Sequence, residues 1–182
     1  MEKMKALLLS TLMILSVSLM AQKQSFYDFK VKTLEGETFD FASLKGKKVM
    51  IVNTASKCGY TPQYKDLEEL YEQYGGENFV IIGFPANNFA NQEPGTASEI
   101  REFCTKNYGV SFPMMDKISV KGDDMHPLYK WLTSRSLNGV MDSEVKWNFQ
   151  KYLVDEKGNL VDVLLSKEKP ASEKVTKWLA AR

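Results

Sequence analysis

Cys58 and Cys104 are the two residues of this chain that are best suited to chemistry. A cysteine thiolate is a strong nucleophile, and its sulfur passes through reversible oxidation states. His126 is the sole histidine, which excludes zinc sites rich in histidine. We therefore expect no metal centre and no cofactor, and we expect any catalysis to depend on sulfur.

Cys58 lies between two segments of different pattern. Before it, residues 48–55 (KVMIVNTA) form a short apolar run, which predicts a strand buried on both faces. After it, residues 61–76 (TPQYKDLEELYEQYGG) have apolar residues at helical spacing, with Thr61 as a candidate cap and Pro62 in the first turn. Cys58 is therefore predicted to lie in a loop between the carboxyl end of a strand and the start of a helix, where open α/β sheets bind ligands.

This position favours the ionised form of the Cys58 thiol. The unpaired N–H groups and the positive dipole end of a helix stabilise an anion, and Lys57 adds a nearby positive charge. The alternative is that Cys58 forms half of a structural disulfide, since disulfides persist in exported proteins. Position 61 is threonine, so the sequence lacks a Cys-x-x-Cys motif and Cys58 has no resolving thiol beside it.

Cys104 is predicted to lie on a second helix, in residues 96–109 (TASEIREFCTKNYG). Thr96 and Glu99 have the spacing of a capping box, and Gly109 ends the helical pattern. On an apolar helix face a cysteine most often serves as a small buried hydrophobe. The predicted apolar face of this helix consists of Ile100, Phe103, Cys104 and Tyr108.

The other segments complete a mixed sheet with helices against it. A second apolar run, residues 78–86 (NFVIIGFPA), follows the first helix, so this strand–helix–strand unit places its two strands in parallel. Hairpins are expected around Glu35–Gly36 and around residues 155–159 (DEKGN). Further helices are expected from Pro127 and over residues 171–181. The fold class is therefore α/β, with a central mixed β-sheet flanked by helices.

The first residues have the pattern of a bacterial secretory signal. Lys3 and Lys5 precede an uncharged apolar stretch that ends at Met20, and Ala21 is a suitable cleavage residue. The apolar stretch is shorter than the roughly 20 residues of a membrane-spanning helix. We expect residues 1–21 to be a secretory signal peptide and residues 22–182 to form one domain exported to the periplasm. An uncleaved signal would anchor this domain to the membrane.

The charge of the chain excludes one class of partner. The 182 residues carry a formal net charge of +1 at pH 7, and without residues 1–21 the basic and acidic residues balance. Nucleic-acid binding needs a basic stripe, so we expect no nucleic-acid partner. We also expect no contact with the membrane beyond export.

Three blocks of sequence, in this order, resemble the signature segments of the glutathione peroxidase family. They are residues 53–64 (NTASKCGYTPQY), 84–95 (FPANNFANQEPG) and 147–155 (WNFQKYLVD). Three ordered blocks are far more specific than one short motif, and the resemblance covers roughly residues 25–165. It implies a thioredoxin-like fold and the reduction of hydrogen peroxide or organic hydroperoxides, with Cys58 as the peroxidatic residue.

The resemblance also assigns the residues around the reactive sulfur. Gln92, Trp147 and Asn148 match the family residues that gather there. Their amide and indole N–H groups can donate hydrogen bonds to the thiolate and to the departing oxygen. Taken singly, Trp147 would be expected in the core, and Gln92 and Asn148 in polar loops. Their joint occurrence with Cys58 favours a catalytic role.

Cys104 matches the resolving cysteine of those family members that use thioredoxin. The resemblance implies that Cys104 attacks the sulfenic acid on Cys58, and that a thioredoxin-like protein reduces the resulting disulfide. If the two sulfurs start beyond bridging distance, the helix of Cys104 must unwind locally. Glutathione is a less favoured reductant, because Val163 and Leu164 stand where members often carry an arginine followed by an aromatic residue.

Two further departures concern the second block and the length of the chain. Ala86 and Asn88 differ from the common block FPCNQF, so a cysteine often found at position 86 is missing; it is not the usual resolving residue. The stretch between His126 and Trp147 is too short for the segment that builds tetramers in some members. We therefore expect a monomer.

Two other functions are compatible with the sequence. A peroxide sensor or redox relay would use the same sulfenic acid to oxidise a partner protein, and only turnover with a reductant separates it from a peroxidase. A non-catalytic thioredoxin-fold binding module would hold Cys58 and Cys104 in a structural disulfide. The presence of Gln92, Trp147 and Asn148 in the same blocks argues against the binding module.

Overall fold

A computed structural model describes residues 24–181, so the expected signal at residues 1–21 lies outside the described residues. The centre of the fold is a sheet with strand order β4-β3-β5-β6. β3 and β4 are parallel, whereas β5 pairs antiparallel with both β3 and β6. The mixed sheet predicted from the sequence is therefore confirmed. Its strands are β3 (Lys48–Thr54), β4 (Phe79–Pro85), β5 (Lys151–Val154) and β6 (Leu160–Leu164).

The central strands alternate their side chains between two apolar clusters, as the two-residue period of a strand requires. Val49 and Ile51 of β3 lie in one cluster. Met50 and Val52 lie in the other, on the face that we call the α1 face because α1 (Gln63–Tyr74) packs there. Every residue of β3 and β4 is buried. Both faces are covered, which accounts for the continuous apolar runs in the sequence.

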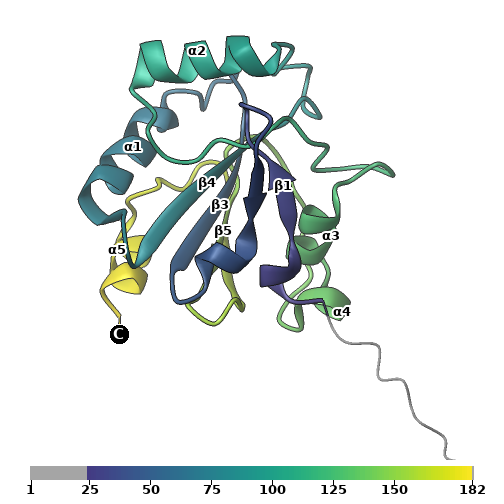
Figure 1. The fold of residues 1–182 in the computed structure, drawn as a ribbon, viewed down its shortest axis with the longest axis vertical. Helices are drawn as coiled ribbons and strands as arrows, with labels where there is room; N and C mark the ends of the chain where they lie inside the picture. The colour runs from purple at the N-terminus through teal and green to yellow at the C-terminus, as the bar shows by residue number, and fades with distance from the viewer. Residues whose placement is uncertain (1–23, 182) are drawn as a thin grey trace, which may run out of the picture.

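Helices cover both faces of the sheet (Figure 1). On the α1 face, α2 (Ala97–Tyr108) and α5 (Glu173–Ala180) join α1 in the apolar cluster. On the other face, α3 (Pro127–Thr133) contributes Trp131 and its neighbours to the second cluster. α2 crosses one end of the sheet, at the top of Figure 1, where it adjoins the turn that follows β3.

The helix ends follow the sequence signals, with one exception. Thr96 forms the predicted capping box of α2, and Gly109 ends that helix in the left-handed conformation, with φ 63°. The prediction that Thr61 caps α1 is wrong, because α1 begins at Gln63 and the residue before it makes no side-chain cap. The Thr61 hydroxyl instead bonds to the backbone of the turn around Cys58.

The hairpins are present as predicted. β1 (Lys30–Lys32) and β2 (Thr38–Asp40) pair antiparallel, as do β5 and β6. His126 precedes α3 and caps it, because its Nδ1 accepts the Leu128 N–H. Sequence periodicity did not predict the one-turn elements, which are too short to repeat an apolar pattern: α4 (Arg135–Asn138) and the 3-10 helices Phe26–Asp28 and Phe41–Leu44.

Among residues 24–181, the helices are all too short or too polar to cross a membrane.

Candidate active site

The turn that carries Cys58 continues into helix α1. The Thr61 N–H donates to the Cys58 carbonyl at 3.0 Å, and the N–H groups of Gln63 and Tyr64 repeat this three-residue spacing. Residues 58–62 therefore form a run of turns that continues into α1, and Cys58 lies at the amino end of this run. Backbone N–H groups at such an end are available to an anion. The Tyr60 N–H donates to Cys58 Sγ at 3.4 Å. The predicted placement of Cys58 between a strand and a helix is confirmed.

Thr61 fixes the shape of this turn. Its buried hydroxyl accepts the Cys58 N–H at 2.9 Å and donates to the Ala55 carbonyl at 2.8 Å. Both hydrogen bonds are made with backbone atoms, so they hold the turn and leave the Cys58 sulfur free of them.

The two cysteines differ in exposure. Cys58 keeps 8% of its surface exposed, against 1% for Cys104. A small solute therefore reaches Cys58 more readily than Cys104.

The loop between β4 and α2 brings Gln92 to the Cys58 turn. The Gln92 carbonyl accepts the Lys57 N–H at 3.0 Å. Ala90 and Asn91, just before it, have positive φ values of 49° and 52°. A left-handed backbone is uncommon for residues with a Cβ atom and costs free energy. This loop thus holds a strained shape where it contacts the turn.

Asn148, in the segment before β5, meets Gln92. Its Nδ2 donates to Gln92 Oε1 at 3.0 Å, and its side chain is fully buried. The next residue, Phe149, has φ 62°, and its N–H donates to the carbonyl of Asn53 on β3. Within residues 24–181, every non-glycine residue with a positive φ therefore lies within two positions of Gln92 or Asn148. The backbone strain of the described chain is concentrated at this site.

Trp147 lies at the surface beside Asn148. Its side chain is 36% exposed, and its indole packs on Phe89 with ring centroids 5.3 Å apart. Its carbonyl accepts a hydrogen bond from Asn53 Nδ2 at 3.0 Å, which fixes its backbone to the end of β3. Trp147 therefore does not occupy the core position that is expected for a tryptophan considered alone.

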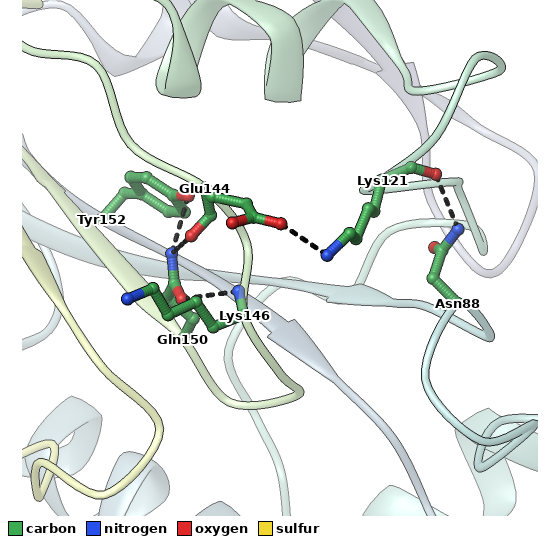
Figure 2. Close-up of polar contacts among 6 residues, drawn as sticks. All are labelled: Asn88, Lys121, Glu144, Lys146, Gln150 and Tyr152. Carbon is green, nitrogen blue, oxygen red and sulfur yellow. Dashed lines mark hydrogen bonds and ion pairs between the residues drawn. The ribbon is translucent and has the colours of Figure 1, made fainter.

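A polar network ties the loops of the site together (Figure 2). Gln150 Nε2 donates to the Glu144 carbonyl at 2.9 Å and to the Tyr152 hydroxyl at 2.8 Å. Lys121 Nζ contacts the Glu144 carboxylate at 2.6 Å, and Asn88 Nδ2 donates to the Lys121 carbonyl at 3.0 Å. Asn88, one of the departures noted in the sequence, therefore helps to connect the β4–α2 loop to the segment before β5.

Glu93 is a buried carboxyl group that sequence reasoning missed. It is 1% exposed, and the Ser56 hydroxyl donates to its Oε2 at 3.1 Å. Burial raises the pKa of Glu93, and the Ser56 hydrogen bonds oppose that rise. Glu93 adds a second link between the Cys58 turn and the β4–α2 loop. Its place beside Gln92 was visible in the sequence, but local sequence gave no sign of its burial.

Cys104 lies on the buried side of α2, in the same apolar cluster as Cys58, and both cysteines are free thiols. Burial raises the pKa of the Cys104 thiol to about 11, while the Tyr64 hydroxyl opposes this shift. The Tyr64 hydroxyl is buried and has no hydrogen-bond partner of good geometry among residues 24–181. The fold thus holds Cys104 as a protonated thiol on the α1 face, without a bond to Cys58.

The arrangement combines a nucleophile, polar groups and a second thiol. Cys58 supplies a sulfur at the amino end of the helical run that continues into α1. Gln92 and Asn148 form a bonded amide pair next to the same turn. No group of three or more His, Cys, Asp or Glu side chains within residues 24–181 could hold a metal ion. The site is suited to redox chemistry on sulfur.

Known proteins share this sequence and fold. A protein-family model described as glutathione peroxidase matches residues 26–133. Glutathione peroxidase-like peroxiredoxin 2 of Saccharomyces cerevisiae is 52% identical over 148 residues, which cover 81% of this chain and 91% of the yeast protein. The crystal structure of Trgpx in its apo form superposes with a TM-score of 0.66 at 39% identity, covering 86% of this chain and 93% of that one.

A more distant structure addresses the fold alone. A thiol:disulfide interchange protein of the thioredoxin family from Chlorobium tepidum TLS has a TM-score of 0.60 at 20% identity, covering 83% of this chain and 92% of that one. The expected thioredoxin-like fold is therefore confirmed.

Proposed function

We propose that this chain, which belongs to the glutathione peroxidase family, is a thiol peroxidase that reduces hydrogen peroxide and organic hydroperoxides at Cys58. The observation that carries the proposal is the geometry of the Cys58 turn. The sulfur accepts the Tyr60 N–H at the amino end of the run into α1, and the Gln92–Asn148 pair adjoins the same turn. The name peroxiredoxin, given to the yeast relative, agrees with sulfur-based reduction of peroxides.

The first chemical step is attack of the Cys58 thiolate on the terminal oxygen of the hydroperoxide. A sulfur–oxygen bond forms, the oxygen–oxygen bond breaks, and the leaving oxygen takes up a proton to become water or an alcohol. Cys58 is left as a sulfenic acid. Because two electrons move from sulfur to oxygen in this step, the bound hydroperoxide needs no metal or cofactor.

Gln92, Trp147 and Asn148 would stabilise the charge that moves in this step. An N–H donor near the leaving oxygen lowers the barrier when it is already oriented. The hydrogen bond between Asn148 and Gln92 and the strained backbone on either side hold the two amides in one arrangement. Asn148 Oδ1 is buried and has no hydrogen-bond partner among residues 24–181, and such departures from the usual pairing of buried polar atoms occur at functional sites.

Cys104 would close the cycle. Its thiol attacks the Cys58 sulfur, a disulfide forms, and the hydroxyl of the sulfenic acid leaves as water with the thiol proton. A thioredoxin-like dithiol protein then reduces the disulfide by exchange. Val163 and Leu164 offer no cationic group to glutathione, which supports a protein reductant.

Single-turnover reaction with hydrogen peroxide tests this proposal. The pre-reduced protein should consume one equivalent of peroxide rapidly, and mass spectrometry should then show the loss of two hydrogens that accompanies a Cys58–Cys104 disulfide. Reduced thioredoxin should restore the starting mass and support repeated turnover, whereas glutathione should do so poorly. Protein that leaves peroxide unconsumed would contradict the peroxidase. Protein that reacts once but is not re-reduced by any thioredoxin-like protein would instead favour a sensor.

We also propose that the chain is exported and that its reductant is a thioredoxin-like protein of the same compartment. The support is the basic start, the apolar stretch up to Met20 and Ala21 as a cleavage residue. The protein recovered from the periplasmic fraction of a bacterial host should therefore begin at residue 22. Recovery from the cytoplasm with residue 1 intact would contradict export, and a full-length protein in the membrane fraction would indicate an uncleaved anchor.

A further inference from the structure

Lys151 is a fully buried lysine that the chemistry above does not use. It lies in β5, paired with Val52 on one side and with Leu164 on the other. Both partners belong to the apolar cluster of the α1 face. Cross-strand partners share a face of the sheet, so a charged side chain occupies a core position there. Departures from the apolar pattern are expected where a site requires them.

The Lys151 ammonium is held by an amide and a backbone carbonyl. Its Nζ donates to Gln63 Oε1 at 2.5 Å and to the Glu168 carbonyl at 2.6 Å. Burial lowers the pKa of Lys151 to about 8, which reflects the cost of removing its charge from water. The cation therefore costs stability, and what it contributes is a fixed connection between β5, α1 and the segment after β6.

The segment after β6, residues 165–168, is held by hydrogen bonds to Gln63 and Lys151 and by hydrogen bonds within the segment. Gln63 Nε2 donates to the Ser166 carbonyl at 2.6 Å, so Gln63 bridges Lys151 and the segment. Within the segment, the Glu168 side chain accepts a hydrogen bond from the Leu165 N–H at 2.6 Å, and the Glu168 N–H donates to the Leu165 carbonyl. Removing the Lys151 ammonium would leave the Glu168 carbonyl and the Gln63 amide without their shared donor.

The same segment forms one wall of a surface hollow whose lining includes Tyr60, two residues after Cys58. The hollow has a volume of about 380 Å³, within the range of small-molecule sites. The Tyr60 N–H donates to Cys58 Sγ, so one lining residue connects the hollow to the reactive sulfur, and a second, Trp147, directly precedes Asn148 in the chain. We call it the Trp147 hollow. It is lined by Tyr60, Lys146, Trp147, Leu165, Ser166 and Lys167.

We propose that the Trp147 hollow binds the organic group of an alkyl hydroperoxide, and that Lys151 is a positioning residue that holds the wall of this hollow through Gln63 and residues 165–168. This rests on the proposed peroxidase function. The rings of Tyr60 and Trp147 and the side chain of Leu165 offer apolar surface to an alkyl or aryl group. Hydrogen peroxide has no such group, so its reaction does not depend on the hollow.

The test compares two peroxides in the variant Lys151→Met, which replaces the ammonium with an unbranched apolar side chain. Stopped-flow measurement of Cys58 oxidation gives a second-order rate constant for each peroxide. We expect the constant for cumene hydroperoxide to fall about tenfold and the constant for hydrogen peroxide to change by less than about twofold. Gln63→Leu removes the other half of the connection and should give the same change in the ratio. The two substitutions together should cost little more than either alone, because they act through one segment.

Lys48→Met is the matched control. Lys48 is also a buried lysine bonded to backbone carbonyls, those of Trp178 and Leu179, but it starts β3 at the opposite end of the strand from the Cys58 turn. It should lower stability without changing the ratio of the two rate constants. Hydrogen exchange gives an independent readout: the amide of Leu165 should exchange faster in Lys151→Met than in Lys48→Met.

Several outcomes would overturn the inference. An equal loss for both peroxides would mean that Lys151 acts on Cys58 itself, and an unchanged ratio would mean that the wall does not select substrates. A change confined to the thioredoxin reaction would assign the hollow to the reductant. If Lys151→Met does not fold, Gln63→Leu, at a half-buried position, decides the question with the same two rate constants. An unmutated protein that reacts with neither peroxide would overturn the proposed function as well, which distinguishes the two failures.

Discussion

Replacing Cys58 with serine is expected to lower the rate constant for reaction with hydrogen peroxide by about 10⁴-fold or more. A serine hydroxyl is not ionised near neutral pH, and its oxygen cannot take up the transferred oxygen as sulfur does when it forms a sulfenic acid. Cys104 cannot take over, because it is 1% exposed and burial raises the pKa of its thiol to about 11. Stopped-flow consumption of hydrogen peroxide by the pre-reduced variant measures the effect.

The Cys58→Ser variant should keep the fold of the site. Thr61 bonds to the N–H of residue 58 and to the Ala55 carbonyl, and neither bond involves the sulfur. The smaller serine oxygen can also accept the Tyr60 N–H that the sulfur accepts. Thermal unfolding should therefore stay close to that of the unmutated protein. Peroxide consumption at an undiminished rate in a folded variant would assign the chemistry to another residue.

Local signals in the sequence were enough to predict the elements that surround Cys58. The apolar run of β3 and the capping pattern at Thr96 depend on residues close together in the chain. The first correctly predicted strand β3, and the second correctly predicted the start of helix α2. Parallel pairing of β3 and β4 follows from the helical crossover that joins these two strands. The grouping of Gln92 with Asn148 came from the family resemblance, since no local pattern links residues so far apart.

The remaining features depend on contacts across the fold. Thr61 has the residue type and place of a helix cap, but its hydroxyl is taken up by the Cys58 turn, so the tertiary hydrogen bonds outweigh the local preference. Lys151 is a charged residue that local sequence does not mark as buried, yet Gln63 and Glu168 bind its ammonium from other elements. Glu93 is hidden in the same way. Polar residues whose burial is set by distant partners were missed.

Cys104→Ser should separate the two halves of the catalytic cycle. The first reaction of Cys58 with peroxide should keep its rate constant within about twofold, because Cys104 is buried in α2 and takes no part in that step. Steady-state turnover with reduced thioredoxin should fall about 100-fold, since Cys58 is left as a sulfenic acid. Mass spectrometry should detect that acid as a dimedone adduct. With excess peroxide, the Cys58 sulfenic acid should be oxidised further to the sulfinic acid, which inactivates the protein.

Thr105→Ser is the control for this prediction, because Thr105 is exposed on the same turn of α2 and its replacement leaves both sulfurs in place. It should keep the initial rate and the turnover. Thioredoxin-driven turnover of Cys104→Ser at the unmutated rate would show that the reductant attacks Cys58 directly. In that case Cys104 would be a buried core residue and not the resolving thiol.

We expect the disulfide to form through opening of the end of α2, because Cys104 is buried in that helix as a free thiol, and the pKa of Cys104 provides a way to observe this opening. The Cys104 carbonyl accepts the Val110 N–H, so the residue stands where the last turn of the helix begins. Helix ends are among the first parts of a fold to open. While α2 is closed, burial raises the thiol pKa from 9.0 to about 11, so the thiolate forms only at high pH. In Cys58→Ser protein, alkylation of Cys104 by iodoacetamide should therefore keep accelerating between pH 9 and pH 11. A rate that levels off near pH 9 would mean that Cys104 is already exposed, and closure of the disulfide would then need no opening of the helix.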